Sequence, residues 1–419
     1  MIFSSGVFSE FVLAENRISW EQCAQEANQK NLTLKKAMES IKKSEIQLDA
    51  IKQGFLPQLS ASTSANRNAA DSASSAPAQD DSSKLQYNND FSYGLNLKQS
   101  IFSGFKDAIG RDKKRVELEI TKLDLEKTMA EVTYNLRSTF LQLIYWQELR
   151  VITKDIMKRR EENLRIVSMR FKGGRENKGS LMKSEANLAQ AQFESADVEK
   201  NLVTTKMQLG QMIGLEKTDD LKVSGSFETK LTDTAPNLEQ LVANTPTYKK
   251  SLATEKVSEY GITLARASYY PEISATASAN KTGDSWPPDQ NRFSVGLSLS
   301  LPLYSGGSTF NDVQAAMSDK IQAETDTINT QHDQLIEIRK AYVMFEETIK
   351  KNEVQESLLK ATETQATIAR NQYALGLVTF QEWDNIEGEL NTQKKNLLTS
   401  KKDAALAEAA WKKTIGKGF

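Results

Sequence analysis

The stretch FSYGLNLKQSIFSGF, residues 91–105, decides the fold, because a period-two pattern ends in it and a long proline-free tract continues after it. The apolar side chains on one predicted face are Phe91, Tyr93, Leu95, Leu97 and Ile101. The intervening positions carry Ser92, Gly94, Asn96, Lys98 and Ser100. Strict alternation of this kind predicts a β-strand with one apolar face and one polar face.

The sequence contains this unit twice. IFSGF at 101–105 matches LYSGG at 303–307, an offset of 202 positions, and FLPQLSASTSAN at 55–66 matches YYPEISATASAN at 269–280. The offset of 202 also superposes, without a gap, Arg137 on Arg339, Phe140 on Tyr342, Phe171 on Tyr373, Gly174 on Gly376 and Glu185 on Glu387. An internal repeat of this length predicts two copies of one structural unit.

Each repeat is predicted to begin with two strands of about 10 to 12 residues. In the second repeat, alternation covers 273–279 and 293–301. This length suits a tilted membrane-spanning strand, and apolar-out, small-polar-in alternation is typical of a barrel wall around water. A soluble antiparallel sheet is the open alternative. Polar loops at 67–90 and 281–292 join the strands, with aromatic residues near their ends at Tyr87, Phe91, Tyr93, Trp286 and Phe293, as expected of an interfacial girdle.

Very long helices follow each strand pair. They are expected over 107–171 and 308–373, where about 65 residues would extend roughly 97 Å at 1.5 Å per residue. Shorter return helices are expected over 180–213 and 381–415, and helices preceding the strands over 32–53 and 237–267. Apolar residues recur every seven positions, as in Ile321, Ile328, Leu335, Tyr342 and Ile349. A sustained heptad predicts helices packed side by side in a coiled-coil manner.

Composition argues against several classes of function. Lys plus Arg number 54 against 55 Asp plus Glu, with the signs interspersed, so nucleic acid is not an expected partner. The single cysteine, Cys23, and the single histidine, His332, give no metal or catalytic cluster. The turn at 172–179 is rich in glycine but lacks the GK[ST] ending of a phosphate loop. The sequence therefore predicts no enzyme, with no catalytic, cofactor or metal site.

Four strands are too few to close a membrane barrel, since the smallest have about eight. Open strand edges are not tolerated in lipid. The alternation therefore predicts that several chains share one barrel, without fixing their number.

The whole pattern over about residues 30–416 resembles the TolC-type outer-membrane efflux proteins, also called outer-membrane factors. The matching motifs are the paired strand starts FLPQLSAS and YYPEISAT, the junctions IFSGF and LYSGG, and the turns FKGGR and YALGLVTFQEWDN. The resemblance implies a mainly α fold with membrane β-strands. In it, each chain gives a duplicated strand pair plus long helical hairpin, and three chains form a 12-stranded β-barrel continued by a 12-helix α-barrel.

The same resemblance implies a function, a location and partners. It implies the outer-membrane channel of a tripartite efflux or type I secretion system, a passive exit duct that reaches from the cell outer membrane into the periplasm. The implied partners are two further copies in a homotrimer, a periplasmic adaptor (membrane fusion) protein, an inner-membrane RND or ABC transporter, and outer-membrane lipid. A soluble, elongated coiled-coil scaffold is the alternative, and in it the strands would be Ser/Ala-rich linkers.

The predicted organisation runs in five parts. Residues 1–29 form an N-terminal segment whose apolar start, from Ile2 to Ala14, resembles the tail of an export signal, with a disordered tail as the alternative. The first repeat covers 30–215, an equatorial linker 216–236, the second repeat 237–416, and a C-terminal tail 417–419.

The resemblance also implies functional residues at the two hairpin turns. A periplasmic gate is expected from Glu382, whose three symmetry copies would form a carboxylate ring favouring cations, with Asn385 and Ser180 at related positions. Adaptor contacts are expected at Lys172, Gly174, Arg175, Lys178, Tyr373, Gly376, Leu377 and Thr379. The plain alternative is a solvent-exposed turn, with Gly174 and Gly376 ending helices and Glu382 favourably placed in a first helical turn.

Overall fold

The structure is a computed structural model that describes residues 17–71, 85–229 and 236–419. The predicted export-signal remnant lies outside the described residues. The chain divides into two compact units. The hairpin unit comprises Met1–Met38, Leu123–Lys249 and Thr330–Phe419, and the sheet unit comprises Glu39–Lys122 and Lys250–Asn329.

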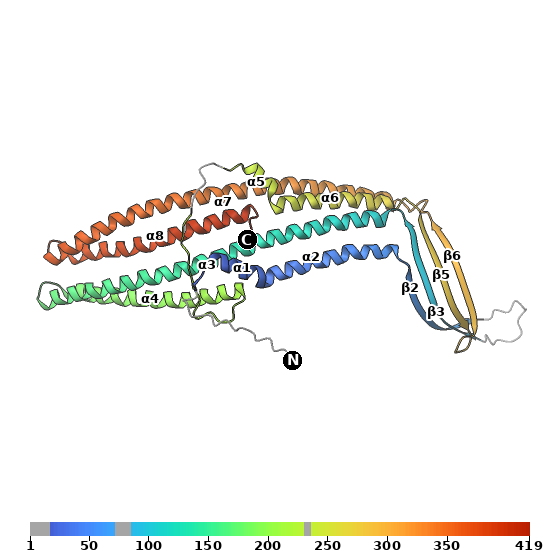
Figure 1. Ribbon diagram of the computed structural model, residues 1–419, viewed down its shortest axis with the longest axis horizontal. Coiled ribbons are helices and arrows are strands. Elements are labelled where there is room, and N and C mark those ends of the chain that lie inside the picture. The colour runs from blue at the N-terminus through green and yellow to red at the C-terminus, as the bar shows by residue number, and fades with distance from the viewer. Residues whose placement is uncertain (1–16, 72–84, 230–235) are drawn as a thin grey trace, which may run out of the picture. The chain divides into compact units, whose positions relative to one another are not determined.

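The predicted order of strands and helices is confirmed (Figure 1). The helices are α1 (Trp20–Lys30), α2 (Leu32–Ile51), α3 (Lys106–Lys172), α4 (Lys178–Ile213), α5 (Leu238–Asn244), α6 (Pro246–Ala267), α7 (Ser308–Leu375) and α8 (Phe380–Thr414). The strands are β1 (Arg17–Ile18), β2 (Gln58–Asp71), β3 (Leu85–Ser103), β4 (Lys222–Val223), β5 (Glu272–Gly283) and β6 (Gln290–Ser300).

One helix prediction is wrong, and one helix was not predicted. The helix expected over 237–267 is two helices, because Pro246 lacks an amide hydrogen and disfavours helical geometry at Thr245, which is extended (φ −66°, ψ 140°). Helix α1 was not predicted. Its start is a capping box, in which Ser19 accepts from the Gln22 amide while the Gln22 side chain accepts from the Ser19 amide.

The sheet unit is built around four antiparallel strands in the order β2-β3-β5-β6. Strand β3 pairs with β5, so the sheet joins the two repeats. The register aligns the predicted alternation across all four strands: Leu59, Leu97, Ala277 and Val295 form one row, and Ser60, Asn96, Ser278 and Ser294 form the next. Because directly paired residues point to the same side, one face of the sheet is apolar and the other is small and polar.

The strands of the first repeat are longer than predicted. Strand β2 has 14 residues and β3 has 19, whereas β5 and β6, with 12 and 11, match the expected length. A register shift between Ser100 and Phe102 brings Phe102, and not Ile101, opposite Ile273. This bulge accommodates one extra residue in β3, so that the apolar side chains at the end of β3 stay on the same face as those of β5.

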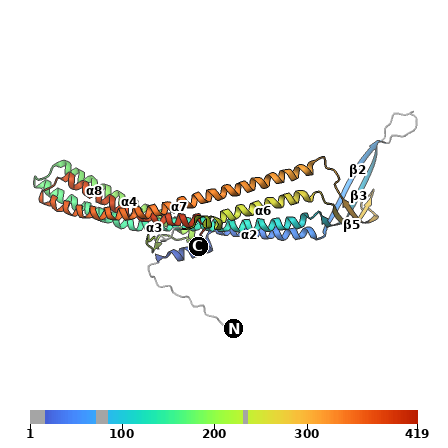
Figure 2. The ribbon, with the colours of Figure 1, turned by 90° about the horizontal axis from the view of Figure 1, so that it is seen from above.

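In the hairpin unit, α3 with α4 and α7 with α8 form two hairpins whose closed ends lie side by side (Figures 1 and 2). The main core of this unit draws on α1, α3, α4, α8 and the 221–227 segment, and its fully buried side chains are Cys23, Ala27, Leu136, Phe140, Leu141, Leu143, Leu209 and Ile213. Strands β1 and β4 pair in parallel beside this core, with Arg17 opposite Lys222 and Ile18 opposite Val223.

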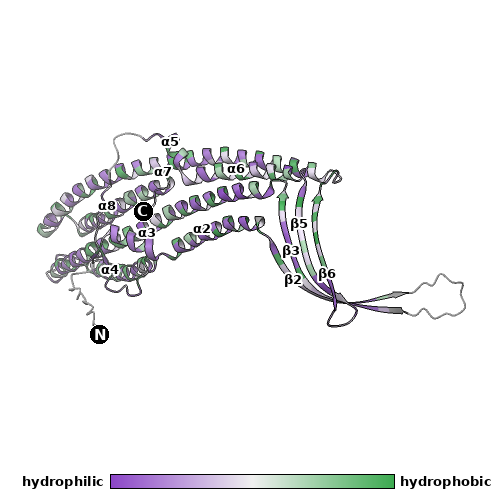
Figure 3. Ribbon diagram, turned by 45° about the vertical axis from the view of Figure 1, so that its right-hand side comes forward, coloured by the Kyte–Doolittle hydropathy of each residue, from purple (hydrophilic) through white to green (hydrophobic). Residues whose placement is uncertain are grey.

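Hydrophilic and hydrophobic residues are mixed along the helices (Figure 3). Of the helices in the described ranges, none has the length and continuous apolar character required to cross a membrane.

Candidate functional site at the hairpin ends

The two hairpin turns have the same backbone geometry. Helices α3 and α7 each end in a Schellman motif, in which the Arg175 amide donates to the Arg170 carbonyl (2.8 Å) and the Leu377 amide to the Gln372 carbonyl (2.9 Å). This geometry requires a left-handed residue, supplied by Gly174 (φ 68°) and Gly376 (φ 80°). The prediction that these two glycines end helices is confirmed.

The helices that leave the turns are capped at equivalent positions. Asn177 accepts a hydrogen bond from the Ser180 amide (2.9 Å), and Thr379 accepts one from the Glu382 amide (3.2 Å). Each bond satisfies an amide that has no partner within its helix. The offset of 202 positions thus holds through both turns, and it places Ser180 and Glu382 at the same point of the first turn.

An aromatic cluster joins the two hairpin ends. Tyr373 stacks on Trp383 with ring centroids 4.3 Å apart, and Phe380 meets both rings edge-on. Val167 of α3 and Ala369 of α7 complete the buried part of the cluster. Tyr373 and Trp383 are each only 1% exposed, so the cluster excludes water. The packing of Val167 from the first hairpin against these side chains of the second fixes the hairpins to one another near their ends.

Polar bonds surround the Tyr373 ring. Its hydroxyl donates to Glu176 in the first turn (2.8 Å), and Arg170 lies 4.7 Å from the ring centroid while donating to the Tyr373 carbonyl (2.8 Å). Burial, together with the Glu176 carboxylate, raises the pKa of Tyr373 well above its ordinary value. Burial by itself raises the pKa of Glu176, but the hydrogen bonds from Tyr373 and the Asn177 amide outweigh it and lower that pKa overall.

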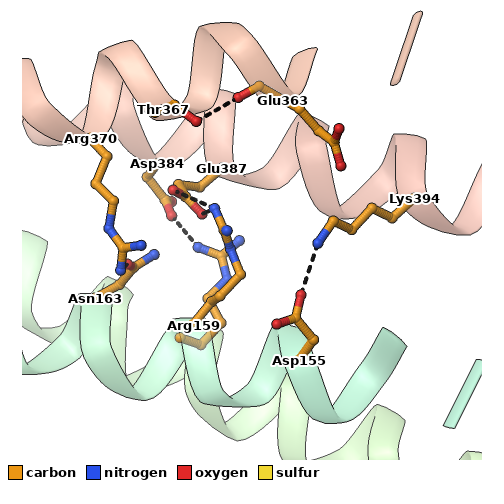
Figure 4. Close-up of polar contacts among 10 residues, drawn as sticks. Asp155, Arg159, Asn163, Glu363, Thr367, Arg370, Asp384, Glu387 and Lys394 are labelled. Atoms are coloured by element: carbon orange, nitrogen blue, oxygen red, sulfur yellow. Dashed lines mark hydrogen bonds and ion pairs between the residues drawn. The ribbon is translucent and has the colours of Figure 1, made fainter. Parts of the chain in front are cut away.

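Further from the turns, ion pairs connect α3 to α8 (Figure 4). Arg159 donates to both carboxylate oxygens of Glu387, at 3.1 and 3.0 Å, and the Glu387 side chain is 1% exposed. Arg160 pairs with Asp384 at 2.7 Å, and Asn187 of α4 donates to the same carboxylate (2.9 Å). Charge-assisted bonds of this kind are short and directional, so they fix the register between the helices.

Three more polar contacts extend this row. Lys394 pairs with Asp155 at 2.8 Å, Lys395 pairs with Glu194, and Arg370 donates to Asn163 at 3.5 Å. Figure 4 shows Lys394 and Asp155 pointing toward one another across the space between their helices. Sequence reasoning did not identify any of these pairs. One signal was available, since Glu387 stands between Trp383 and Leu390 on the buried stripe of α8.

The predicted site residues fall into two groups in the structure. Most are exposed around the turns, namely Glu382, Asn385, Lys172, Gly174, Arg175, Lys178, Gly376, Leu377 and Thr379. Asn385 accepts a hydrogen bond from Gln381 (2.9 Å). The side chains of Ser180 and Tyr373 are buried within the subunit. The role we assign to Tyr373 therefore changes from a direct partner contact to support of the turns.

A groove of about 530 Å³ lies between the turns, lined by residues of both, including Arg175, Lys183, Thr379 and Gln381. Its lining is mixed in charge and mostly polar. Across the described ranges, no three His, Cys, Asp or Glu side chains come together as a metal site. What the geometry offers here is a rigid pair of helix ends with exposed charged and apolar residues.

Comparison with known proteins identifies the family. The model of the outer membrane efflux protein family matches residues 23–215 and again 237–417, one match for each repeat. No match was found among curated protein sequences.

Several solved channels share the fold. The CmeC outer membrane channel of Campylobacter jejuni has a TM-score of 0.78 at 20% identity, covering 96% of this chain and 86% of that chain. The outer membrane protein VceC of Vibrio cholerae has a TM-score of 0.76 at 17% identity, covering 96% of both chains. The MtrE outer membrane channel of Neisseria gonorrhoeae, in its open state, has a TM-score of 0.78 at 14% identity, covering 95% of this chain and 89% of that chain.

These findings confirm the predicted resemblance and fold class. Members of the family are channels of the outer membrane that reach into the periplasm, form trimers, and work with adaptors and inner-membrane pumps. The chain belongs to the outer membrane efflux protein family and is the outer-membrane channel component of an efflux system.

Proposed function

We propose that three copies of this chain assemble into one passive exit duct. The sheet unit carries the proposal. Its outer strands β2 and β6 have no further neighbour in the four-stranded sheet, and its apolar face is uncovered, with Leu59, Leu95, Phe293, Val295 and Leu297 all at least half exposed. Unpaired strand edges need a further strand, and an apolar face of this size needs an apolar surface against it. Pairing β6 with β2 of the next copy, with lipid on the apolar face, covers both.

The remaining face suits a water-filled passage. Ser60, Asn96, Ser278 and Ser294 form a row of small polar side chains across all four strands. Hydroxyls on this face bond to one another, as between Ser64 and Ser92 (2.7 Å) and Ser278 and Ser294 (2.8 Å). This lining is mostly small and polar, with Lys98 and Arg292 as larger charged side chains on the same face, and it supports passage without strong selection for one cargo. We infer that the chain has no catalytic step of its own.

The hairpin ends are proposed to form the periplasmic gate. In a threefold ring, Glu382 would occur three times at the entrance, with the exposed Asn385 one turn further along α8. Carboxylate rings favour cations over anions. Ser180, at the equivalent point of the first hairpin, is buried and uncharged, so the ring would alternate charged and neutral positions.

The same ends are proposed to contact the adaptor. The first turn is basic and exposed, with Lys172, Arg175 and Lys178, whereas the second exposes Leu375 and Leu377. The complementary partner surface would present acidic residues to the first turn and an apolar patch to the second. Gly174, Gly376 and Thr379 would contribute through backbone and cap geometry. The inner-membrane partner would be an RND or ABC transporter.

The domain boundaries are proposed from the repeat. Residues 30–215 and 237–416 would each form one strand pair with one hairpin, and 216–236 would link them at mid-length. The family matches over 23–215 and 237–417 support these limits.

The test is assembly and conductance of the full chain. We expect trimers that resist SDS until heated, recovered from the outer-membrane fraction, and cation-preferring pores in planar lipid bilayers. Recovery of a folded monomer without pore activity would overturn the proposal and favour the coiled-coil scaffold. Crosslinking from Arg175 or Leu377 should capture an adaptor, and capture of none would overturn the assignment of the turns.

A further inference from the structure

The contact between the two hairpins of one chain, here called the inner seam, is formed by helix faces whose equivalents in the other repeat are exposed on the same chain. The inner seam joins α3 and α4 to α8, and its ion pairs include Arg159 with Glu387 and Arg160 with Asp384. The repeat offset of 202 positions carries α3 onto α7 and α4 onto α8. The chain therefore carries a second α3-like face, on α7, and a second α8-like face, on α4.

The α7 face is apolar and uncovered in the hairpin unit. Its side chains Val343, Val354, Leu358 and Ile368 are between 43% and 56% exposed. Their equivalents on α3 are Leu141, Ile152, Ile156 and Ile166, all buried or packed against a core cluster. An apolar stripe at coiled-coil spacing predicts a helix partner.

The α4 face shows the same relation. Its side chains Met182, Phe193, Val203 and Met207 are between 53% and 65% exposed. Their equivalents on α8 are Asp384, Lys395, Ala405 and Ala409, all of which lie in or beside the inner seam. The uncovered faces of α7 and α4 are therefore the counterparts of the two faces that meet inside the chain. The occupant that fits each is a second copy of this chain, in an outer seam of α7 against the neighbour's α4.

The two seams differ in charge at every ion pair. The inner pair Arg159–Glu387 corresponds to Ala361 and Glu185, and Arg160–Asp384 corresponds to Thr362 and Met182. The inner pair Asp155–Lys394 corresponds to Ser357 and Gln192 in the other repeat. The inner pair Glu194–Lys395 corresponds to Asn396 and Phe193. None of the four outer pairs combines opposite charges.

We infer that this difference is a pairing code: the seam within a copy is ionic, the seam between copies is apolar, and the contrast fixes the alternating order of hairpins around the ring. The wrong order would place the neighbour's α4 on α3, with Met182 against Arg160 and Gln192 against Asp155. Arg159 would still meet a carboxylate, Glu185, but Arg160 and Asp155 would each lose a partner of opposite charge, which disfavours that arrangement. Val354 and Leu358 would also lose their apolar partner. The inference rests on the proposed homotrimer and adds which faces meet in it.

Cysteine pairs in the full chain test the order of hairpins. The native Cys23 can remain, because burial raises its pKa to about 12 and leaves almost no thiolate at neutral pH. Oxidation of the variant Ala361→Cys with Glu185→Cys should link copies covalently into trimers. The wrong-order pair, Arg159→Cys with Glu185→Cys, should give no link between copies.

The outcomes separate the inference from the proposed function. Inter-copy links through 159 and 185, or none through 361 and 185 in a protein that light scattering shows to be trimeric, overturn the code but leave the trimer standing. A chain that is monomeric by light scattering overturns both.

A second measurement does not depend on disulfide geometry. The double variant Met182→Asp with Phe193→Lys gives α4 the charges that α8 has at the equivalent positions. It should weaken trimer association by about a hundredfold or more, since two apolar contacts are lost in each outer seam. The matched control, Val151→Asp with Met169→Lys, changes two α3 side chains that are equally exposed but have no counterpart in the inner seam. Helical circular dichroism should be unchanged in both. Equal trimer fractions for the two variants would overturn the inference.

Discussion

Replacing Arg159 by Met should loosen the contact between the hairpins far more than its exposure suggests. The substitution keeps an unbranched, partly apolar side chain but removes both hydrogen bonds to Glu387, at 3.1 and 3.0 Å. Removing one partner of a buried ion pair costs about 3–5 kcal/mol, because the other charge stays desolvated. Glu387 is 1% exposed and Arg159 25%, so some water reaches the pair and we expect about 3 kcal/mol.

Hydrogen–deuterium exchange of the α8 amides around Glu387 measures this loss. An opening free energy lowered by about 3 kcal/mol corresponds to exchange accelerated by roughly 100-fold or more, at 1.4 kcal/mol for each factor of ten. The control is Arg165→Met, which breaks the exposed pair of Arg165 with Glu162 on α3 and should leave the exchange rate close to that of the wild type, because water screens this pair. The double variant Arg159→Met with Glu387→Leu should return close to the wild-type rate, because no charge is left buried. Equal acceleration by the two single variants, or no recovery in the double variant, would refute the reasoning.

Three further predictions concern the turns. The pKa of Glu176 is lowered in the folded chain, so its hydrogen bond from Tyr373 stabilises the fold above the unfolded pKa of about 4.3 and is lost as the pH falls through the folded value. The variant Glu176→Gln should therefore be less stable than the wild type at pH 7. In thermal unfolding, this difference in stability should shrink below about pH 4. Gly174→Ala should destabilise by about 1 kcal/mol because its φ is 68°, whereas Gly173→Ala, with ordinary contacts of 3.5 and 3.7 Å, should be close to neutral in the same unfolding assay. Glu382→Gln should lower the cation preference of single pores in planar bilayers, and an unchanged reversal potential would argue against Glu382 at the gate.

The strands and long helices could be predicted because their periodicities are strong. Alternation in 91–97 and 293–301 fixes which residues share a face, and the structure confirms that register across four strands. The bulge before Phe102 could not be predicted, since one extra residue leaves no mark on so short a pattern. The break at Pro246 was readable, because proline at that position removes a helical hydrogen bond.

The contacts between hairpins could not be predicted from the sequence. Arg159 and Glu387 are 228 positions apart, and the chain has 54 basic and 55 acidic residues from which pairs could be drawn. The repeat identifies equivalent positions but not partners, and Glu185 and Glu387 are equivalent yet only Glu387 is buried. Tyr373 was placed correctly at the turn, but only the structure shows that its ring lies beneath the turn and not on its surface.

The pairing of β3 with β5 has a consequence for how the chain folds. Partners such as Leu95 and Ala279 are 184 positions apart, with the whole first hairpin between them. Each helical hairpin, by contrast, closes through turns of a few residues. Loop closure over long distances is slow, whereas local helical contacts form early. We therefore expect the helical hairpins to form while the strands are still separate. The apolar face of the four-stranded sheet is then completed last, after the rest of the subunit has folded.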